Sequence, residues 1–247
     1  MRPPLLITDL GRRPYQPVLE LQRDLARARL RGDLAEDVLL LVEHEPVVTL
    51  GRGTKTTSLP FPPAELARRG FEVMDVERGG DVTVHCPGQL VGYPILDLRT
   101  HRTDLHWYLR QLEEALISGL GAIGVTAGRN PGRTGVWVGP RKIASIGVHV
   151  KQWVTLHGFA LNVLTDLSLF DLVVPCGIPG VVMTSVAREL AVSRGSEATS
   201  GSEAPPAAEV LWTQTQAEVV TAFGEVFART PVALAAGDLP VAVAEGT

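Results

Sequence analysis

The chain has 247 residues, of which 45% are hydrophobic and 20% charged, a composition typical of one large globular domain or two small ones and unlike that of collagen-like, coiled-coil or disordered chains. With 23 Lys and Arg against 27 Asp and Glu, the formal net charge is -4, so no global positive field favours nucleic acid. Because the apolar runs fall far below the roughly 20 residues of a bilayer span and the N-terminus lacks a signal peptide pattern, we expect a cytoplasmic protein without nucleic-acid or membrane partners.

The first half of the chain alternates helical and extended patterns. Apolar residues recur at helical spacing over 15–31, which predicts an amphipathic helix behind a short strand at 5–8. A short helix is bounded by Pro62 and Gly70. A leucine stripe after Asp104, whose side chain suits an N-cap, predicts a longer helix through Leu120. Apolar or alternating runs predict strands at 37–43, 47–51, 71–76, 82–84 and 90–98.

The second half continues with strands. Residues 135–138 and 141–150 predict a hairpin, and 154–163 a third strand. Short turns between neighbouring strands favour a mixed, largely antiparallel central sheet flanked by helices, so the predicted fold class is α+β. A last helix, around 217–227, completes a single domain over 1–230. Residues 193–208 are unpatterned and predict a disordered loop, and 231–247 form a weakly patterned tail.

The two cysteines, Cys86 and Cys176, are too few for a disulfide framework, and we expect both to be thiols. Cys176 lies between Pro175 and Gly177 after an apolar run, in a turn that can hold a thiol at the mouth of a cleft. Taken alone, this segment favours a buried cysteine that acts as a small hydrophobe. As a nucleophile, the thiol would need a base.

Lys142 is a candidate for that base. If strand 141–150 is regular, Lys142 shares a face with apolar residues at every second position, whereas Ser145 and Gly147 lie on the opposite face. A lysine buried in this way can accept or share a thiol proton, because burial disfavours its charged form. The alternative is a lysine at the strand edge whose stem covers apolar surface while its ammonium reaches water.

The segment ERGGDVTVHCPGQL, at 77–90, is a second candidate for a site. Its paired glycines, arginine and histidine suit close approach of the backbone to a ligand, or simply a turn. It contains no phosphate-loop or dinucleotide-binding motif. The six histidines of the chain show no zinc-binding spacing, so no metal site is predicted, and His101 is expected to face solvent.

Four segments, in order, resemble the motifs of the octanoyltransferase family of the lipoate and biotin protein ligase superfamily: RGGDVTVHCPGQLVGYPILDL, GRTGVWVGPRKIASIGVHV, HGFALNV and PCGI. The resemblance covers 38–190 and implies the fold of the ligases' catalytic domain. It implies that an octanoyl group passes from octanoyl-acyl carrier protein to a lipoyl-domain lysine, as the first step of endogenous protein lipoylation. Cys176 would carry the group as a thioester, and Lys142 would lower the pKa of the thiol and relay its proton.

The resemblance also implies the binding residues and the partners. The acceptors would be apo lipoyl domains of 2-oxoacid dehydrogenases and the glycine cleavage H protein, with no cofactor, and we expect a monomer. The acyl chain would lie against three segments, namely Arg78, Gly79, Gly80, Asp81, Val82, Thr83, Val84 and His85, then Ser145, Ile146 and Gly147, then Gly158, Phe159 and Ala160.

Two electrostatic features are expected on the same basis. Backbone N–H groups beside Cys176 and in the Gly79-Gly80 turn are candidate oxyanion donors. Because acyl carrier protein is acidic, a local basic patch would favour its binding. Its candidates are close in sequence, namely Arg129, Arg133, Arg141 and Lys151.

The chain departs from the family pattern at Cys86, where the family has glycine. If this position requires a positive φ, a side chain there strains the backbone and narrows the pocket. Cys86 is then inert, a competing nucleophile or an oxidation partner of Cys176.

Three other functions are open. An ATP-dependent lipoate or biotin ligase would need no nucleophilic thiol. A thioesterase would pair Cys176 with His85 or His149 and release free acid without an acceptor. A non-catalytic acyl-binding or lipoyl-domain-binding module would form no covalent adduct.

Overall fold

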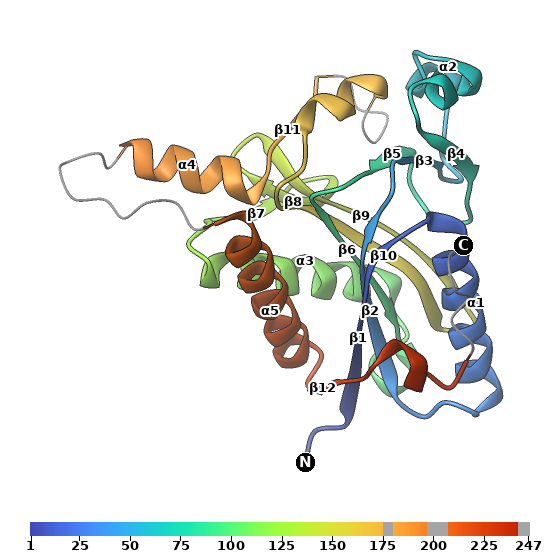
Figure 1. Ribbon diagram of the computed structural model, residues 1–247. Coiled ribbons are helices and arrows are strands. Elements are labelled where there is room, and N and C mark those ends of the chain that lie inside the picture. Colours follow the sequence, from blue (N-terminus) through green and yellow to red (C-terminus); the bar gives the residue numbers. More distant parts are fainter. Residues whose placement is uncertain (175–179, 197–206, 242–247) are drawn as a thin grey trace.

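The computed structural model describes residues 1–174, 180–196 and 207–241. A nine-stranded sheet runs through the molecule (Figure 1), antiparallel from β2 to β7 and parallel where β1 meets β2 and β12. The predicted mixed, largely antiparallel sheet is therefore confirmed. In spatial order its strands are β12 (Thr230–Ala233), β1 (Pro4–Arg13), β2 (Asp37–His44), β6 (Gln89–Ile95), β10 (Val154–Asn162), β9 (Arg141–Lys151), β8 (Arg133–Val138) and β7 (Gly128–Asn130), and β11 (Val182–Met183) pairs with β9.

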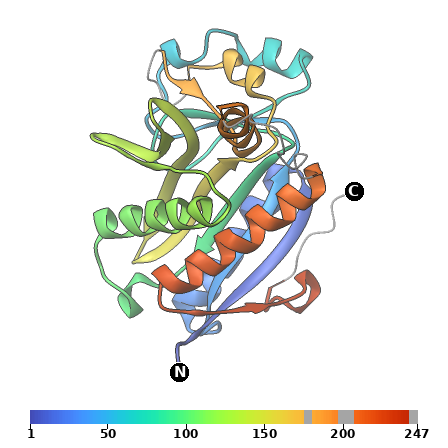
Figure 2. The ribbon, with the colours of Figure 1, turned by 90° about the vertical axis from the view of Figure 1, so that its left-hand side faces the viewer.

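Helices cover both faces of this sheet. Figure 2 shows α3 (Leu105–Ala122) and α5 (Ala208–Val226) lying across one face, while α1 (Tyr15–Arg31) packs on the other. Asp104 caps α3 as predicted, since its carboxylate accepts a hydrogen bond from the Trp107 amide at 3.0 Å. Each face therefore has its own apolar core, and the apolar stripes of the helices fill both.

A smaller sheet stands at one end of the large one. Its order is β4 (Glu72–Asp75), β3 (Val47–Leu50) and β5 (Val82–His85). The short helix α2 (Pro63–Arg68) and the 3-10 turn η3 (Leu167–Leu172) pack against it around Leu66 and Phe170. Because β5 leads directly into β6, residues 86–88 join the two sheets, and the paired glycines lie in the loop just before β5.

The structure corrects the prediction near the C-terminus. Helix α4 (Val186–Ser196) includes the first residues of the predicted loop 193–208, and residues 197–206 lie outside the described ranges. The sequence pattern of this segment is weak, and tertiary contacts stabilise the helix instead. Val186 is buried in the core and Glu189 is bound to Arg141. Strand β12, at the start of the predicted tail, was missed because it pairs only at the sheet edge with β1.

A buried ion cluster ties β2 to the C-terminal part of the chain. The Asp37 carboxylate accepts hydrogen bonds from Arg29 at 2.9 Å and Arg229 at 2.8 Å, and lies 2.7 Å from His101 Nε2. The His101 side chain is 4% exposed, so the expectation that it faces solvent is wrong, because this carboxylate holds it inside. Burial raises the pKa of Asp37, but the His101 hydrogen bond and the two arginine charges outweigh burial and leave that pKa lowered.

We predict that Asp37→Ala lowers the free energy of unfolding by about 3–5 kcal/mol, because it leaves buried cations unpaired. Urea unfolding measures the loss. Since the folded-state pKa is lowered, the stabilisation is present above the unfolded pKa of about 4 and is lost as the pH falls further. Asp24→Ala, which breaks the exposed pair with Arg27, should cost at most about 1 kcal/mol. Equal losses in the two variants would contradict this account.

Candidate active site

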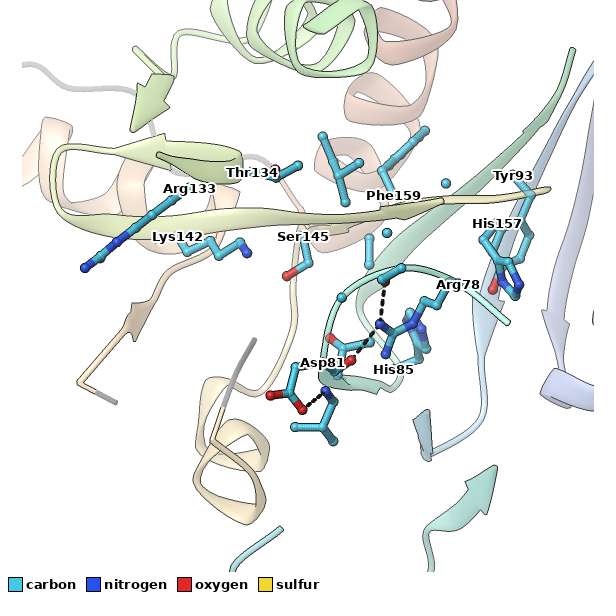
Figure 3. Close-up of a pocket in the computed structure, with 18 of the residues that line it drawn as sticks. Arg78, Asp81, His85, Tyr93, Arg133, Thr134, Lys142, Ser145, His157 and Phe159 are labelled. Atoms are coloured by element: carbon cyan, nitrogen blue, oxygen red, sulfur yellow. Dashed lines mark hydrogen bonds between the residues drawn. The ribbon is translucent and has the colours of Figure 1, made fainter. Parts of the chain in front are cut away.

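A cavity of about 210 Å³ lies between the large sheet and the segment that leads into β5 (Figure 3). Strands β9 and β10 form one wall, and residues 78–85 form much of the other. Of the predicted acyl-binding residues, the structure brings all but Val84 to this cavity; Val84 is buried in the core of the small sheet. The lining residues are Tyr15, Arg78, Gly79, Gly80, Asp81, Val82, Thr83, His85, Tyr93, Gly132, Arg133, Thr134, Lys142, Ser145, Ile146, Gly147, His157, Gly158, Phe159 and Ala160.

Strand β9 is not regular, and this decides which side chains reach the cavity. One step along β8 spans two residues along β9, so Ile143 is an extra residue in a β-bulge. Ile143 and Ala144 are both fully buried in the core beneath α3 and α5. Lys142 and Ser145 both line the cavity. The expectation that they lie on opposite faces is therefore wrong, because the extra residue shifts the alternation by one.

Lys142 is 2% exposed, so the alternative of a lysine reaching water is also wrong. Its Nζ lies 5.5 Å from the centroid of the Trp137 ring, within cation–π range. Its stem passes over Gly135, where a Cβ atom would lie 2.7 Å from Lys142 Cε. The Gly135 amide in turn donates to Oε1 of the buried Glu113 at 3.1 Å. Trp137, Gly135 and Glu113 thus set the position of the lysine.

Arg78 organises the loop that faces β9. Among the described residues, its guanidinium donates five hydrogen bonds, to the Thr49 hydroxyl and carbonyl and to the carbonyls of Gly79 and Asp81. The Gly79 amide donates to the Val148 carbonyl of β9 at 2.8 Å. Gly79 therefore fastens the loop to the sheet, and the expectation that its N–H serves as an oxyanion donor is wrong.

The end of the cavity opposite the lysine is closed by tyrosine and histidine rings. Tyr15 stacks on His85, with ring centroids 5.7 Å apart and an interplanar angle of 17°. The Tyr15 hydroxyl lies 3.4 Å from His157 Nδ1. The Tyr93 hydroxyl lies 2.8 Å from His44 Nε2. We call these five residues the ring cluster.

The histidines of the ring cluster are held in the neutral form. Burial lowers the pKa of His44 to about 4 and the pKa of His85 well below its ordinary value. Burial also lowers the pKa of His157, although Glu77 opposes this. His44 Nδ1 lies 3.0 Å from the Arg13 carbonyl and donates to it, so His44 Nε2 accepts the hydrogen of the tyrosine hydroxyl.

The predicted basic patch does not form. Arg129 pairs with two glutamates of α3, and Arg141 pairs with Glu189. Lys151 stands at the opposite end of β9 from Arg141, about 30 Å away at the usual rise per residue. Only Arg133 of the four lines the cavity.

The two cysteines differ in what the structure describes. Cys176 falls in 175–179, outside the described residues. Cys86 is fully buried in the core of the small sheet and does not line the cavity. Its φ is not positive, so the expected strain does not arise. Burial raises the pKa of its thiol to about 12, which supports an inert side chain.

The described ranges also bear on metals and membranes. Within 1–174, 180–196 and 207–241, no three His, Cys, Asp or Glu side chains form a group that could hold a metal ion. No helix in the same part of the chain has both the length and the apolar character to cross a membrane.

Comparison with known proteins identifies the family. The model of the lipoyl protein ligase A/B catalytic domain matches residues 14–199. An octanoyltransferase of Nostoc sp. is 50% identical over 183 residues, which are 74% of this chain and 81% of the relative. An octanoyltransferase of Solibacter usitatus is 53% identical, over 73% of this chain and 82% of the relative. The chain belongs to the octanoyltransferase family. It is an acyltransferase that transfers octanoyl groups in protein lipoylation.

Solved structures show the same fold. Protein Ta0514 from T. acidophilum, with bound lipoic acid, has a TM-score of 0.65 at 17% identity, covering 95% of this chain and 90% of its own. A lipoate-protein ligase A bound with ATP has a TM-score of 0.66 at 16% identity, covering 95% and 89%. The predicted α+β fold of the lipoate ligase catalytic domain is thereby confirmed.

Sequence reasoning missed four polar residues of this octanoyltransferase's cavity, namely Tyr15, Tyr93, Thr134 and His157. Tyr93 and His157 lie inside the family motifs, but only the fold shows that they face the same space. His157 adopts a φ of 57°, a strained value for histidine that concentrates at functional sites. Tyr15 precedes every motif and reaches the cavity only because α1 begins there.

We predict that Gly135→Ala reduces kcat of octanoyl transfer about 10- to 100-fold, because small displacements of a reacting group have effects of this size. The added Cβ would lie 2.6 Å from the Ala144 carbonyl oxygen and would displace Lys142, at a φ of 123°. Gly128→Ala, in the same hairpin region with open space around its Cβ, is the matched control and should retain activity. A fully active Gly135→Ala enzyme would refute this positioning of Lys142.

Proposed function

We propose that this octanoyltransferase takes the octanoyl group from octanoyl-acyl carrier protein, holds it as a thioester on Cys176 and delivers it to the lysine of an apo lipoyl domain. The observation that carries the proposal is the buried Lys142 at one end of a cavity lined by the family's motif residues. A buried amine beside an acyl-sized cavity suits proton transfer to and from a sulfur nucleophile.

The chain on both sides of Cys176 supports its proximity to Lys142. Beyond the undescribed residues, β11 pairs with β9, and Met183 lies opposite Lys142. Before them, the Val174 amide donates to the Ser58 carbonyl at 2.9 Å, and the Ser58 hydroxyl donates to a carboxylate at the cavity. The described chain on both sides of Cys176 is therefore linked by these contacts to residues that line the cavity.

The proposed reaction has two half-reactions. In the first, the Cys176 thiolate attacks the donor carbonyl, the bond from that carbon to the carrier sulfur breaks, and the departing thiolate takes a proton from Lys142. In the second, the lipoyl-domain amine attacks the enzyme thioester, neutral Lys142 accepts a proton from that amine, and Cys176 leaves as a thiolate. The free energy of the thioester exchange is close to zero and formation of the amide is favourable, so both half-reactions are feasible. Because the carrier protein leaves before the lipoyl domain reacts, ping-pong kinetics follow.

The partners follow from the same chemistry. Lipoyl-domain proteins are the acceptors of this family, and the proposal specifies the apo lipoyl domains of 2-oxoacid dehydrogenases and the glycine cleavage H protein. It also specifies a monomer in the cytoplasm, a reducing compartment that keeps Cys176 as a thiol.

The alternative hypothesis of a thioesterase that pairs Cys176 with His149 is weakened by the position of this histidine. His149 faces a separate hollow beside α1 and does not line the cavity.

We predict that mixing the enzyme with octanoyl-acyl carrier protein, without ATP, gives an octanoyl adduct in intact-protein mass spectra. Neutral hydroxylamine should remove it, because the bond is a thioester. The adduct should survive Cys86→Ser and should be absent or hydroxylamine-stable in Cys176→Ser. An adduct that requires ATP would favour the ligase, free octanoate without an acceptor would favour the thioesterase, and no adduct at all would favour a binding module.

A second prediction concerns Lys142. Lys142→Arg should lose adduct formation and transfer across about pH 6 to 9, because a guanidinium is not neutralised in that range. Pre-steady-state rates of acylation at several pH values measure this. Normal acylation by Lys142→Arg over the whole range would overturn the proton-transfer role while leaving the thioester intact.

A further inference from the structure

The ring cluster of Tyr15, His44, His85, Tyr93 and His157 takes no part in the proton transfers described above. It lies at the far end of the cavity, as Figure 3 shows for Tyr93 and His157 relative to Lys142. Val148 pairs with His157 across the two strands. Allowing for the bulge, the Cα atom of Val148 is five steps along β9 from that of Lys142, or about 17 Å, and the Lys142 side chain spans part of this separation because its ammonium points toward Ser145 (Figure 3).

The wall between the two ends contains small residues on both strands, with the Arg78 side chain packed over Gly147. Gly147 pairs with Gly158 at mid-cavity, and Ala160 follows on the same strand. These three residues carry at most a methyl group, so none of their side chains blocks a chain that starts beside Lys142. Phe159 also lines the cavity between the two ends, and beyond it the ring cluster closes the cavity.

The rings are fixed in place by one another. Tyr15 is 2% exposed, stacks on His85, and lies 5.0 Å from the centroid of the His44 ring. Its hydroxyl is within 3.4 Å of His157 Nδ1. Displacing the Tyr15 ring would therefore disrupt contacts with three other side chains at once, so this end of the cavity adapts poorly to a longer ligand.

The polar groups of two rings of the cluster do not oppose an apolar ligand, whereas His157 Nε2 is buried without a hydrogen bond to any described residue, 3.7 Å from a Glu77 carboxylate oxygen. The Tyr93 hydroxyl donates to His44 Nε2. Gln89 Nε2 donates to the Val84 carbonyl, so the other amide atom of Gln89, its Oε1, accepts from His85 Nδ1 at 2.8 Å. Because these donors are satisfied within the protein, a hydrocarbon terminus against the rings leaves none of them unpaired.

We propose that the ring cluster is a rigid end stop for the acyl chain, and that Tyr15 is the residue that excludes chains longer than octanoyl. This inference rests on the proposed function, in which the acyl chain occupies the cavity with its carbonyl near Lys142. Tyr15 belongs to α1 rather than to either sheet, so its side chain can be shortened without altering the strands that position Lys142. Length selection and chemistry are therefore separable.

The test compares acyl-enzyme formation from hexanoyl-, octanoyl-, decanoyl- and dodecanoyl-acyl carrier protein. One methylene too many in a closed apolar site costs about 10-fold or more in rate, so the wild-type enzyme should fall at least about 10-fold from octanoyl to decanoyl. Tyr15→Leu should raise the decanoyl and dodecanoyl rates relative to octanoyl by at least about 10-fold. Tyr15→Phe, which keeps the ring, should keep the wild-type length preference.

Tyr108→Leu is the matched control. Tyr108 is fully buried in the core beneath α3 and α5 and does not line the cavity, so its replacement removes the same ring without altering length preference. If Tyr15→Leu does not fold, Tyr15→Met provides the comparison with a flexible apolar side chain.

The outcomes separate the two proposals. Octanoyl adducts with an unchanged length profile in Tyr15→Leu or Tyr15→Met would overturn the end stop and leave the proposed function standing. The same shift in Tyr108→Leu would also overturn it, because the effect would then be one of general loosening. No adduct from any donor in the wild-type enzyme would overturn the proposed function and the end stop together.

Discussion

The single extra residue in strand β9 is the constraint on which the site depends. With regular alternation, Lys142 and Ser145 would lie on opposite faces of the sheet. The bulge sends Ile143 and Ala144 together into the core beneath α3 and α5, and leaves Lys142 on the same side as Ser145. Bulges re-aim side chains in this way near active sites. Here it places an amine at one end of a cavity that lies over the sheet.

A buried lysine needs protein contacts that hold it in place, and three parts of the structure supply them. Strand β8 contributes the Trp137 ring and the bare backbone of Gly135, and α3 holds that backbone through buried Glu113. The loop braced by Arg78 closes the cavity from the other side. The end that contains Lys142 is thus fixed from the sheet, whereas the far end is closed from α1, so the proposed chemistry and the proposed chain selection depend on different elements.

Much of the fold was predictable because local patterns and tertiary structure agree. The helix at 15–31, the Asp104 cap and the order of strands follow from apolar periodicity and turn residues. The segments predicted to bind the acyl chain come from motifs that the fold brings to one cavity. Strand β12 and helix α4 were missed because each depends on partners distant in sequence, and the bulge was missed because the prediction assumed regular alternation along the strand.

The side chains around the cavity were only partly predictable for the same reason. Arg129 and Arg141 are close in sequence to Arg133 but are bound to glutamates of two different helices, so sequence proximity did not make a patch. Tyr15 carries no motif, and His101 has no local sign of its buried carboxylate partner. Long-range packing decides each of these positions, and no local sequence pattern encodes that packing.

The most direct measurement is a crystal structure of the enzyme octanoylated from octanoyl-acyl carrier protein. The account predicts density for an acyl chain that begins at Cys176 beside Lys142, follows the cavity past Ser145 and Ala160, and ends in contact with the Tyr15 ring. A chain bound in the hollow beside α1, or directed into solvent, would contradict the assignment of this cavity as the acyl site.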